Sequence, residues 1–332
     1  MKQIKRLDYI DRAKGIAILL MILGHAAPGR VILTWIFAFH MPLFFIVSGV
    51  LVREKFRGTI SFFEVKTSFK KRLFQLGIPY VVFSLVLTLF YGFLNYTTSG
   101  NWGVFSYIFQ IVTLQGVDSL WFIPCYFAAE FLMKLTCMCS SKLVNVIGVG
   151  SILLIIVLFS LSDAISSFWL LRLGIKFLIC YSFIYIGYAL SLLNLLKHLN
   201  TVISILVLGM CSIFALYNGF SEIGSIQLNN PILFYVNAIG ITWTLFFFLN
   251  ISKDTKVMKS LSFFGRNSIV ILCTNNIIIE IIRLLDYRIW NNILLSWNTC
   301  GAIVLSVIII LIEIGLIKIV NSTQAKSLFG KR

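Results

Sequence analysis

Long apolar runs constrain the fold of this chain more than any other feature of its sequence. Ten of them recur along its 332 residues, and each is long enough to cross a hydrocarbon core of about 30 Å as a helix. A backbone in lipid must satisfy its own hydrogen bonds, which favours helices over open strands. We therefore predict an all-α polytopic integral membrane protein with about ten transmembrane helices, at residues 12–28, 31–52, 73–95, 119–137, 143–161, 169–193, 199–217, 231–250, 262–282 and 293–320.

The composition agrees, because 59% of the residues are hydrophobic and only 12% are charged, which is too little polar surface for a soluble globule. A weaker apolar stretch at 104–114 predicts a loop or a re-entrant segment. No Pro/Ser-rich linker or obvious internal repeat divides the chain, so we expect a single domain over 1–332. The seven cysteines include no C-x-x-C pair, which indicates small core residues and neither a disulfide framework nor a metal site.

The positions of the basic residues predict the orientation of the helices. If the N-terminus lies inside, 23 of the 28 Lys and Arg residues fall on the inner side, and four fall on the outer side: Arg30, Arg172, Arg283 and Arg288. The positive-inside rule then places both termini in the cytoplasm, in a multi-pass protein of the inner or plasma membrane whose first helix is retained. Topology and attraction to anionic membrane lipids explain the net charge of +16, so no nucleic-acid partner is expected.

The first two apolar runs hold an unusual number of polar groups. Asp11, Lys14 and His25 lie in or at the edge of the first run, and His40 lies in the second. Lys14 and His25 are eleven residues apart, so on a helix they share a face and are separated by about 16 Å along the axis. Asp11 precedes Lys14 by one turn on the same side. Polar groups are costly in hydrocarbon, so a membrane protein that keeps them usually uses them.

Each of these groups also has a structural interpretation. Asp11 and Lys14 would be an interfacial ion pair, and His25 would lie at the outer headgroup level. His40 falls near mid-membrane, where the sequence His40-Met41-Pro42 predicts a kinked helix. Two histidines on consecutive antiparallel helices can face one another, and this favours a site. Four further charged residues inside or near the runs each need a partner or water: Glu130, Lys176, Glu280 and Glu313.

The segments D-x-x-K-G-I-A-I-x-x-x-I-x-G-H and F-H-M-P-L-F-F-x-x-S-G resemble the membrane acyltransferase family 3. Within that family they are similar to the fucose 4-O-acetylase-like sugar O-acetyltransferases. The resemblance implies transfer of an acetyl group from acetyl-CoA to a glycan hydroxyl. The family signature of an Arg, ten residues and a His corresponds to Lys14 and His25. Lysine keeps the positive charge but lacks the bidentate fork that suits phosphate.

Three other segments are similar to the family's motifs. The basic segment before the third helix ends at Arg72, but the family's second Arg, three residues later, is Gln75 here. Trp121 belongs to a Leu-Trp-Phe motif, although an aromatic belt would also supply it. Residues 264–268 match a Gly-x-Asn-Ser helix start, and Asn275 stands where many relatives have a histidine.

The resemblance assigns roles to six residues. His25 is the expected general base, His40 orients it or binds the acceptor, and Asp11 holds Lys14 in place. The phosphates of acetyl-CoA, a cosubstrate rather than a bound cofactor, are expected near Lys14, Lys71 and Arg72, although positive-inside topology explains the basic loop equally well. No metal is expected. A transient acyl-histidine is an open alternative to direct transfer.

Two rival functions remain open at this point. A secondary transporter would use the buried His and Glu residues as a proton relay. A relative with another acyl donor, such as succinyl-CoA, would keep the family and change the group transferred. The expected acceptor is a surface polysaccharide or glycan precursor, but its identity and the oligomeric state are not encoded in a readable pattern.

Overall fold

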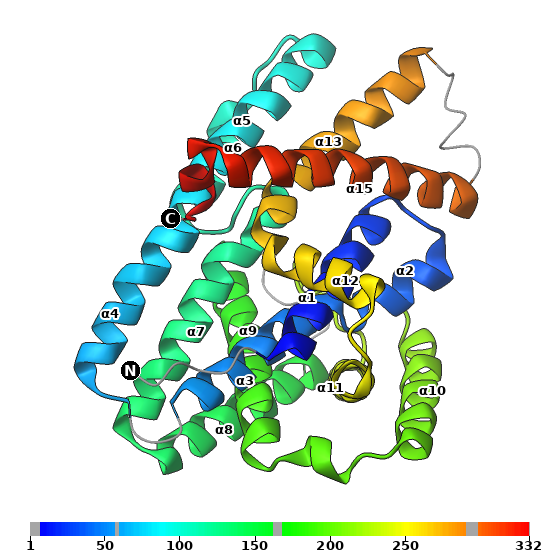
Figure 1. Ribbon diagram of the computed structural model, residues 1–332. Helices are drawn as coiled ribbons and strands as arrows, with labels where there is room; N and C mark the ends of the chain where they lie inside the picture. Colours follow the sequence, from blue (N-terminus) through cyan, green and yellow to red (C-terminus); the bar gives the residue numbers. More distant parts are fainter. Residues whose placement is uncertain (1–6, 57–59, 162–167, 290–297, 332) are drawn as a thin grey trace. The chain divides into compact units, whose positions relative to one another are not determined.

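The computed structural model describes residues 7–56, 60–161, 168–289 and 298–331. Within these ranges the chain is helical and forms no β-strand, only an isolated bridge between Glu222 and Gln227. The predicted all-α class is therefore confirmed. Figure 1 shows the helices in chain order from blue to red.

Among the described residues, nine helical segments are long and apolar enough to cross a membrane. Each overlaps one of the predicted runs: Arg30–Lys55, Phe62–Ser99, Asp118–Cys139, Ser141–Phe159, Trp169–Leu192, Thr201–Asn218, Pro231–Ile251, Ser268–Ile289 and Asn298–Ser322. The remaining run lies in α1 (Asp8–His25), which is helical but carries four charged residues in its first two turns. The start of the last predicted run, 293–297, lies outside the described residues. The chain is a polytopic membrane protein.

The chain divides into two compact units. The first unit contains the chain through Gly24, Gly29–Lys66 and Ala128–Ser268. The second contains His25–Pro28, Thr67–Phe127 and the chain from Ile269 onward.

The first unit is built around a close contact between α3 (His40–Lys55) and α9 (Trp169–Leu192). A Cβ atom on Gly49 would lie 1.9 Å from the carbonyl oxygen of Ile184, and one on Gly187 would lie 2.0 Å from that of Ile46. Only glycine lets two helix backbones approach so closely, as is common between membrane helices. The other helices of this unit are α2 (Arg30–Phe37), most of α7 (Phe122–Cys139), α8 (Ser141–Leu161), α10 (Thr201–Asn218), α11 (Pro231–Ile251) and α12 (Lys256–Arg266).

The second predicted run forms two helices instead of one kinked helix. α2 ends at Phe37 and α3 begins at His40, because Phe39 leaves the helical conformation with φ −146°. Pro42 falls in the first turn of α3. The N–H groups of a first turn have no acceptor within the helix, so a proline there costs no intrahelical hydrogen bond. The expected kink at Pro42 is therefore replaced by a break just before His40.

The second unit contains the end of α4 (Phe62–Arg72), a π-helical turn at Leu73–Gly77 and α5 (Ile78–Ser99). α4, the turn and α5 form one continuous helical segment (Figure 1). α6 (Val104–Val112) has nine residues and a length of about 14 Å, too short to cross a bilayer. This agrees with the predicted loop or re-entrant segment. The remaining elements are a 3₁₀ turn at Asp118–Trp121, the start of α7, α13 (Ser268–Ile289) from Ile269, α15 (Asn298–Ser322) and a 3₁₀ turn at Gln324–Phe329.

The run predicted at 262–282 is divided by a helix break. α12 ends at Arg266, and Asn267 leaves the helix while its amide donates to the carbonyl of Phe263 over 2.8 Å. α13 begins at Ser268, so the apolar span is Ser268–Ile289 and the predicted boundaries were too early. α12 is a separate helix with exposed lysines.

Candidate functional site

Two glycines bring the start of α1 into backbone contact with α12. A Cβ atom on Gly15 would lie 2.0 Å from the carbonyl oxygen of Leu261, and one on Gly265 would lie 1.8 Å from that of Asp11. No side chain larger than hydrogen fits at either position without a backbone shift. The charged first turns of α1 are therefore held against the end of α12.

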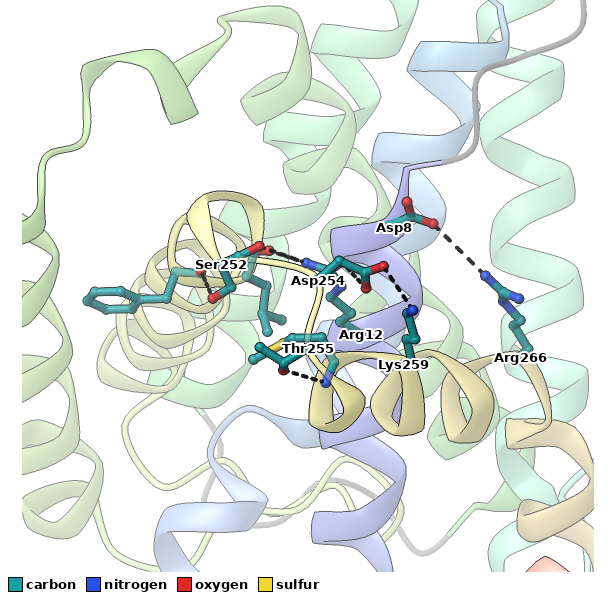
Figure 2. Close-up of polar contacts among 10 residues, drawn as sticks. Asp8, Arg12, Ser252, Asp254, Thr255, Lys259 and Arg266 are labelled. Atoms are coloured by element: carbon teal, nitrogen blue, oxygen red, sulfur yellow. Dashed lines mark hydrogen bonds and ion pairs between the residues drawn. The ribbon is translucent and has the colours of Figure 1, made fainter.

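Arg12 caps the end of α11 from within this crossing. Its Nη1 donates to the carbonyls of Leu249 and Ser252 at 3.1 and 3.2 Å, and its Nη2 lies 3.4 Å from Oδ1 of Asp254. Lys259 approaches the other oxygen of Asp254 at 3.7 Å, as Figure 2 shows. The last carbonyls of a helix lack intrahelical partners, and a guanidinium satisfies them. Arg12, which sequence reasoning did not single out, is a structural residue.

The carboxylate of Asp11 is shared by two cations. Nζ of Lys14 lies 2.9 Å from Oδ1, and Nε of Arg266 lies 3.3 Å from Oδ2. Arg266 also lies 3.9 Å from Asp8 (Figure 2). The expected contact between Asp11 and Lys14 is present, whereas Arg266 was missed because sequence spacing does not report a contact between distant helices. An ammonium group has three donors, so Lys14 keeps donors beyond the one that Asp11 uses.

His25 is the last residue of α1, and its backbone is held by an arginine. Nη2 of Arg283 donates to the carbonyl of His25 over 2.8 Å, and Nη1 pairs with Glu280 at 2.9 Å. The hydroxyl of Thr299 donates to the carbonyl of Pro28 over 2.8 Å in the turn that follows. The residue as a whole is half-buried. Glu280 and Arg283 are three residues apart on α13, so they lie on the same face of the helix, and this spacing could have predicted their ion pair from the sequence.

His40 is buried, with 2% of its surface exposed. Its Nδ1 lies 2.9 Å from the carbonyl oxygen of Ile36 in α2, and its ring meets the edge of Phe37 at 4.8 Å between centroids. A carbonyl oxygen can only accept, so Nδ1 carries a proton. In the neutral ring the lone pair then belongs to Nε2. His25 and His40 belong to different units, and the expectation that they face one another stays a prediction.

The predicted phosphate-binding residues of the basic loop lie at the end of α4. Lys71 is exposed, and Nη1 of Arg72 lies 3.5 Å from Oε1 of Gln75, the residue at the position of the family's second Arg. Gly330, with φ +65°, packs on the backbone of Gln75, where a Cβ atom would lie 2.3 Å from its carbonyl oxygen. The next residue, Lys331, which sequence reasoning missed, therefore also lies close to this turn. Partial burial lowers the pKa of Lys331.

Most of the charged residues inside the apolar runs find partners on their own or a neighbouring helix. Glu130 and Lys134 form a buried ion pair at i, i+4 spacing on α7. Asn275 is buried, and its amide donates to Oδ1 of Asn276 over 3.1 Å. Glu313 contacts Thr274 of α13. Within the described ranges, no three His, Cys, Asp or Glu residues are grouped so as to hold a metal ion.

Comparison with known proteins identifies the family. A family model described as an acyltransferase domain matches residues 7–312, which include His25, His40, Lys14 and the whole of α13. Among curated proteins and among solved structures, none matches the chain significantly. The family match spans nearly the whole chain, and the described helices are those of a multi-pass membrane protein. The chain therefore belongs to the acyltransferase 3 family and is a membrane acyltransferase.

Proposed function

We propose that this membrane acyltransferase transfers an acetyl group from acetyl-CoA to a sugar hydroxyl of a surface polysaccharide or glycan precursor. It would lie in the inner or plasma membrane with both termini in the cytoplasm, and would belong to the fucose 4-O-acetylase-like branch. The sequence resemblance supplies the donor and the acceptor class. The structural observation that supports the proposal is the position of His25 at the end of α1, where Arg283 fixes its backbone carbonyl.

Acetyl-CoA would be bound through its phosphates by basic residues on the cytoplasmic side. Lys14 keeps ammonium donors beyond its contact with Asp11, and Lys71 is exposed at the end of α4. Arg72 lies close to Gln75 and adds a guanidinium there, whereas the ammonium group of Lys331 donates to Oδ1 of Asn321 over 3.0 Å. Phosphate oxygens are strong acceptors for such groups. Asp11 would hold Lys14 in place.

His25 would act as the general base of acetyl transfer. Its imidazole takes the proton of the sugar hydroxyl as the oxygen attacks the thioester carbonyl, forming the new C–O bond. The C–S bond then breaks, and the imidazolium returns its proton to the departing sulfur, giving the acetyl ester and CoA thiol. The Arg283–Glu280 pair would position the base by fixing the end of α1. His40, with its lone pair on Nε2, would accept a hydrogen bond from the sugar or orient His25.

The test is the O-acetyl content of cell-surface glycans, measured by mass spectrometry. Cells would carry the wild type, His25→Ala, His198→Ala or an empty vector, with membrane abundance checked. His198 is exposed on the 3₁₀ turn at Leu195–His198 and is a matched control for loss of an imidazole. We expect acetyl esters with the wild type and His198→Ala and none with His25→Ala at equal abundance.

Other outcomes would change the proposal in defined ways. Acetyl esters that persist in His25→Ala would make His25 structural and move the base to His40. A succinyl or other acyl mass on the glycan would keep the family and change the donor. Absence of any acyl ester with the wild type, or of acetyl-CoA consumption by purified protein with glycan, would contradict the proposal.

A further inference from the structure

Among the residues that the structure describes, the carboxyl group of Glu313 has no cationic partner. Glu313 lies in α15 with none of its surface exposed. Its Oε1 is 2.7 Å from the hydroxyl of Thr274 on α13, and its Oε2 is buried without a hydrogen-bond partner among the described residues. A buried ionised carboxylate without a cation costs far more free energy than the neutral acid. The surroundings of Glu313 therefore favour the protonated form.

The hydrogen bonds of Thr274 lead to the same conclusion by a separate route. Its Oγ1 is 2.9 Å from the carbonyl oxygen of Val270 and 2.7 Å from Oε1 of Glu313. A hydroxyl has one hydrogen, and the carbonyl can only accept it. The bond from a mid-helix threonine to the carbonyl four residues earlier is a common one. If Thr274 donates to Val270, then Glu313 must donate to Thr274, and this requires a protonated carboxyl group.

Within the described part of the chain, the charged and titratable groups near Glu313 do not supply a counter-charge. Cys273, on the facing side of α13, is 2% exposed and brings a thiol. On α15 itself the next basic residue, Lys318, is exposed. The 3₁₀ turn at Gln324–Phe329 packs on α15 and carries Lys326. Lys326 follows Glu313 by thirteen residues, which corresponds to about 20 Å along a helix axis. Asn275 and Asn276 are neutral.

Glu130 provides a contrast inside the same protein. It is also buried, with 4% of its surface exposed, but it forms an ion pair with Lys134. An ammonium group in contact with a carboxyl group favours the carboxylate form. Two buried glutamates in membrane-length helices thus have opposite surroundings, one with a cation and one with a hydroxyl.

We propose that Glu313 is a proton-binding site that holds its proton at neutral pH and donates it to the hydroxyl of Thr274. This site is independent of the acetyl-transfer reaction proposed above, because it rests on contacts between α13 and α15 alone. Its ligand is a single proton rather than a metal ion. Glu313→Gln mimics the protonated acid, because the amide can donate to Thr274 in the same way, so this variant should fold.

The first test is reaction with an apolar carbodiimide, dicyclohexylcarbodiimide, in membranes at neutral pH. A protonated carboxyl group passes its proton to a carbodiimide nitrogen, and its oxygen then bonds to the central carbon, so the adduct keeps every atom of both reactants. Mass spectrometry of the α15 peptide should find the adduct on Glu313 and not on Glu130 in the α7 peptide. Labelling of Glu313 that is suppressed when sodium replaces choline would overturn the proposal, because it would indicate a carboxylate that binds a cation.

Infrared difference spectroscopy gives a second test that does not depend on access of the reagent. The spectrum of purified wild type minus that of Glu313→Gln should contain the carbonyl stretching band of a protonated carboxyl group. Glu130→Gln is the matched control and should leave that band in place. Thr274→Val should shift the band, because the acid loses its acceptor. If Glu313→Gln removes a carboxylate band instead, Glu313 is ionised and the proposal fails.

Discussion

The two ends of α1 hold their polar groups in different ways. At the start, four cationic side chains and three acidic ones contact one another or helix-end carbonyls across the crossing with α12: Arg12, Lys14, Lys259, Arg266, Asp8, Asp11 and Asp254. At the end, Arg283 contacts the backbone carbonyl of His25. Any residue would supply that carbonyl. The charges at the start are thus explained by packing, whereas the identity of His25 is not explained by its contact with Arg283.

This difference predicts different consequences of mutation. Apart from Lys14, for which donor binding is proposed, changes at the start of α1 should reduce stability, and the loss of activity should follow the loss of folded protein. Changes around His25 should reduce turnover in a protein that remains folded.

Gly265→Ala should have the largest effect. The added Cβ would lie 1.8 Å from the carbonyl oxygen of Asp11, so the backbones of α1 and α12 must move apart. We expect a loss of roughly 2 to 3 kcal/mol in stability, measured as a lower melting temperature in detergent together with lower membrane abundance. Gly209→Ala on α10 is the control, because its Cβ would meet no atom within 4 Å. Equal stability of Gly265→Ala and wild type would mean that the crossing is not tight.

Asp11→Asn should destabilise the protein less. It removes the carboxylate that Lys14 and Arg266 share and leaves both cations near a neutral amide. Because the Arg266 side chain is 46% exposed and can turn to water, we expect a loss of about 2 kcal/mol, below that of a fully buried pair. The melting temperature of purified protein is the measurement.

Asp8→Asn is the matched control for this change. Its contact with Arg266 is longer, at 3.9 Å, and its side chain is 60% exposed. An exposed pair of this kind contributes roughly 0 to 1 kcal/mol. If Asp11→Asn has the stability of Asp8→Asn but loses activity, the start of α1 has a chemical role and the contrast between its two ends is wrong.

The sequence predicts the helices of this protein better than it predicts their breaks. Apolar runs are local, and nine of the ten predicted runs correspond to described helical segments of membrane length. The break before His40 was not predicted, because Pro42 was read as a kink inside a continuous helix and not as a residue of the first turn of a new one. The break at Asn267 was missed for a similar reason, because the apolar residues at the end of α12 read as part of the following span.

The candidate site was predictable where its contacts are local. Asp11 and Lys14 are three residues apart on one helix, so their contact follows from helix geometry. The same spacing rule applies to Glu280 and Arg283. Their pair was not predicted, although their i, i+3 spacing on one helix would have allowed it. The contact of Arg266 with the start of α1 joins residues about 255 positions apart, and no helical period reports it. Contacts that depend on how helices cross must come from the structure.

Arg283→Lys should reduce turnover about tenfold with little change in stability or in KM for acetyl-CoA. The guanidinium binds the carbonyl of His25 and Glu280 at the same time, and an ammonium group has no fixed fork for the two contacts. The end of α1 would then be held less firmly, and the imidazole would be less well placed. The measurements are kcat and KM of purified protein with glycan acceptor, together with the melting temperature.

Arg288→Lys is the control, because Arg288 lies on the same helix, in its last turn and beyond the contact with His25. It should leave kcat unchanged. A parallel fall of melting temperature and kcat in Arg283→Lys would make Arg283 a purely structural residue, and the two ends of α1 would then be alike.

Lys14→Arg should have the smallest effect, and it tests whether the start of α1 also binds the donor. Arginine restores the residue of the family signature and adds a planar fork that matches both carboxylate and phosphate. We expect KM for acetyl-CoA to fall about threefold while kcat stays the same, since Asp11 at 2.9 Å still holds the cation in place. Lys14→Gln should raise KM instead. If neither change alters KM, Lys14 belongs entirely to the packing of α1 against α12, and the phosphate-binding role falls to the basic residues at the end of α4.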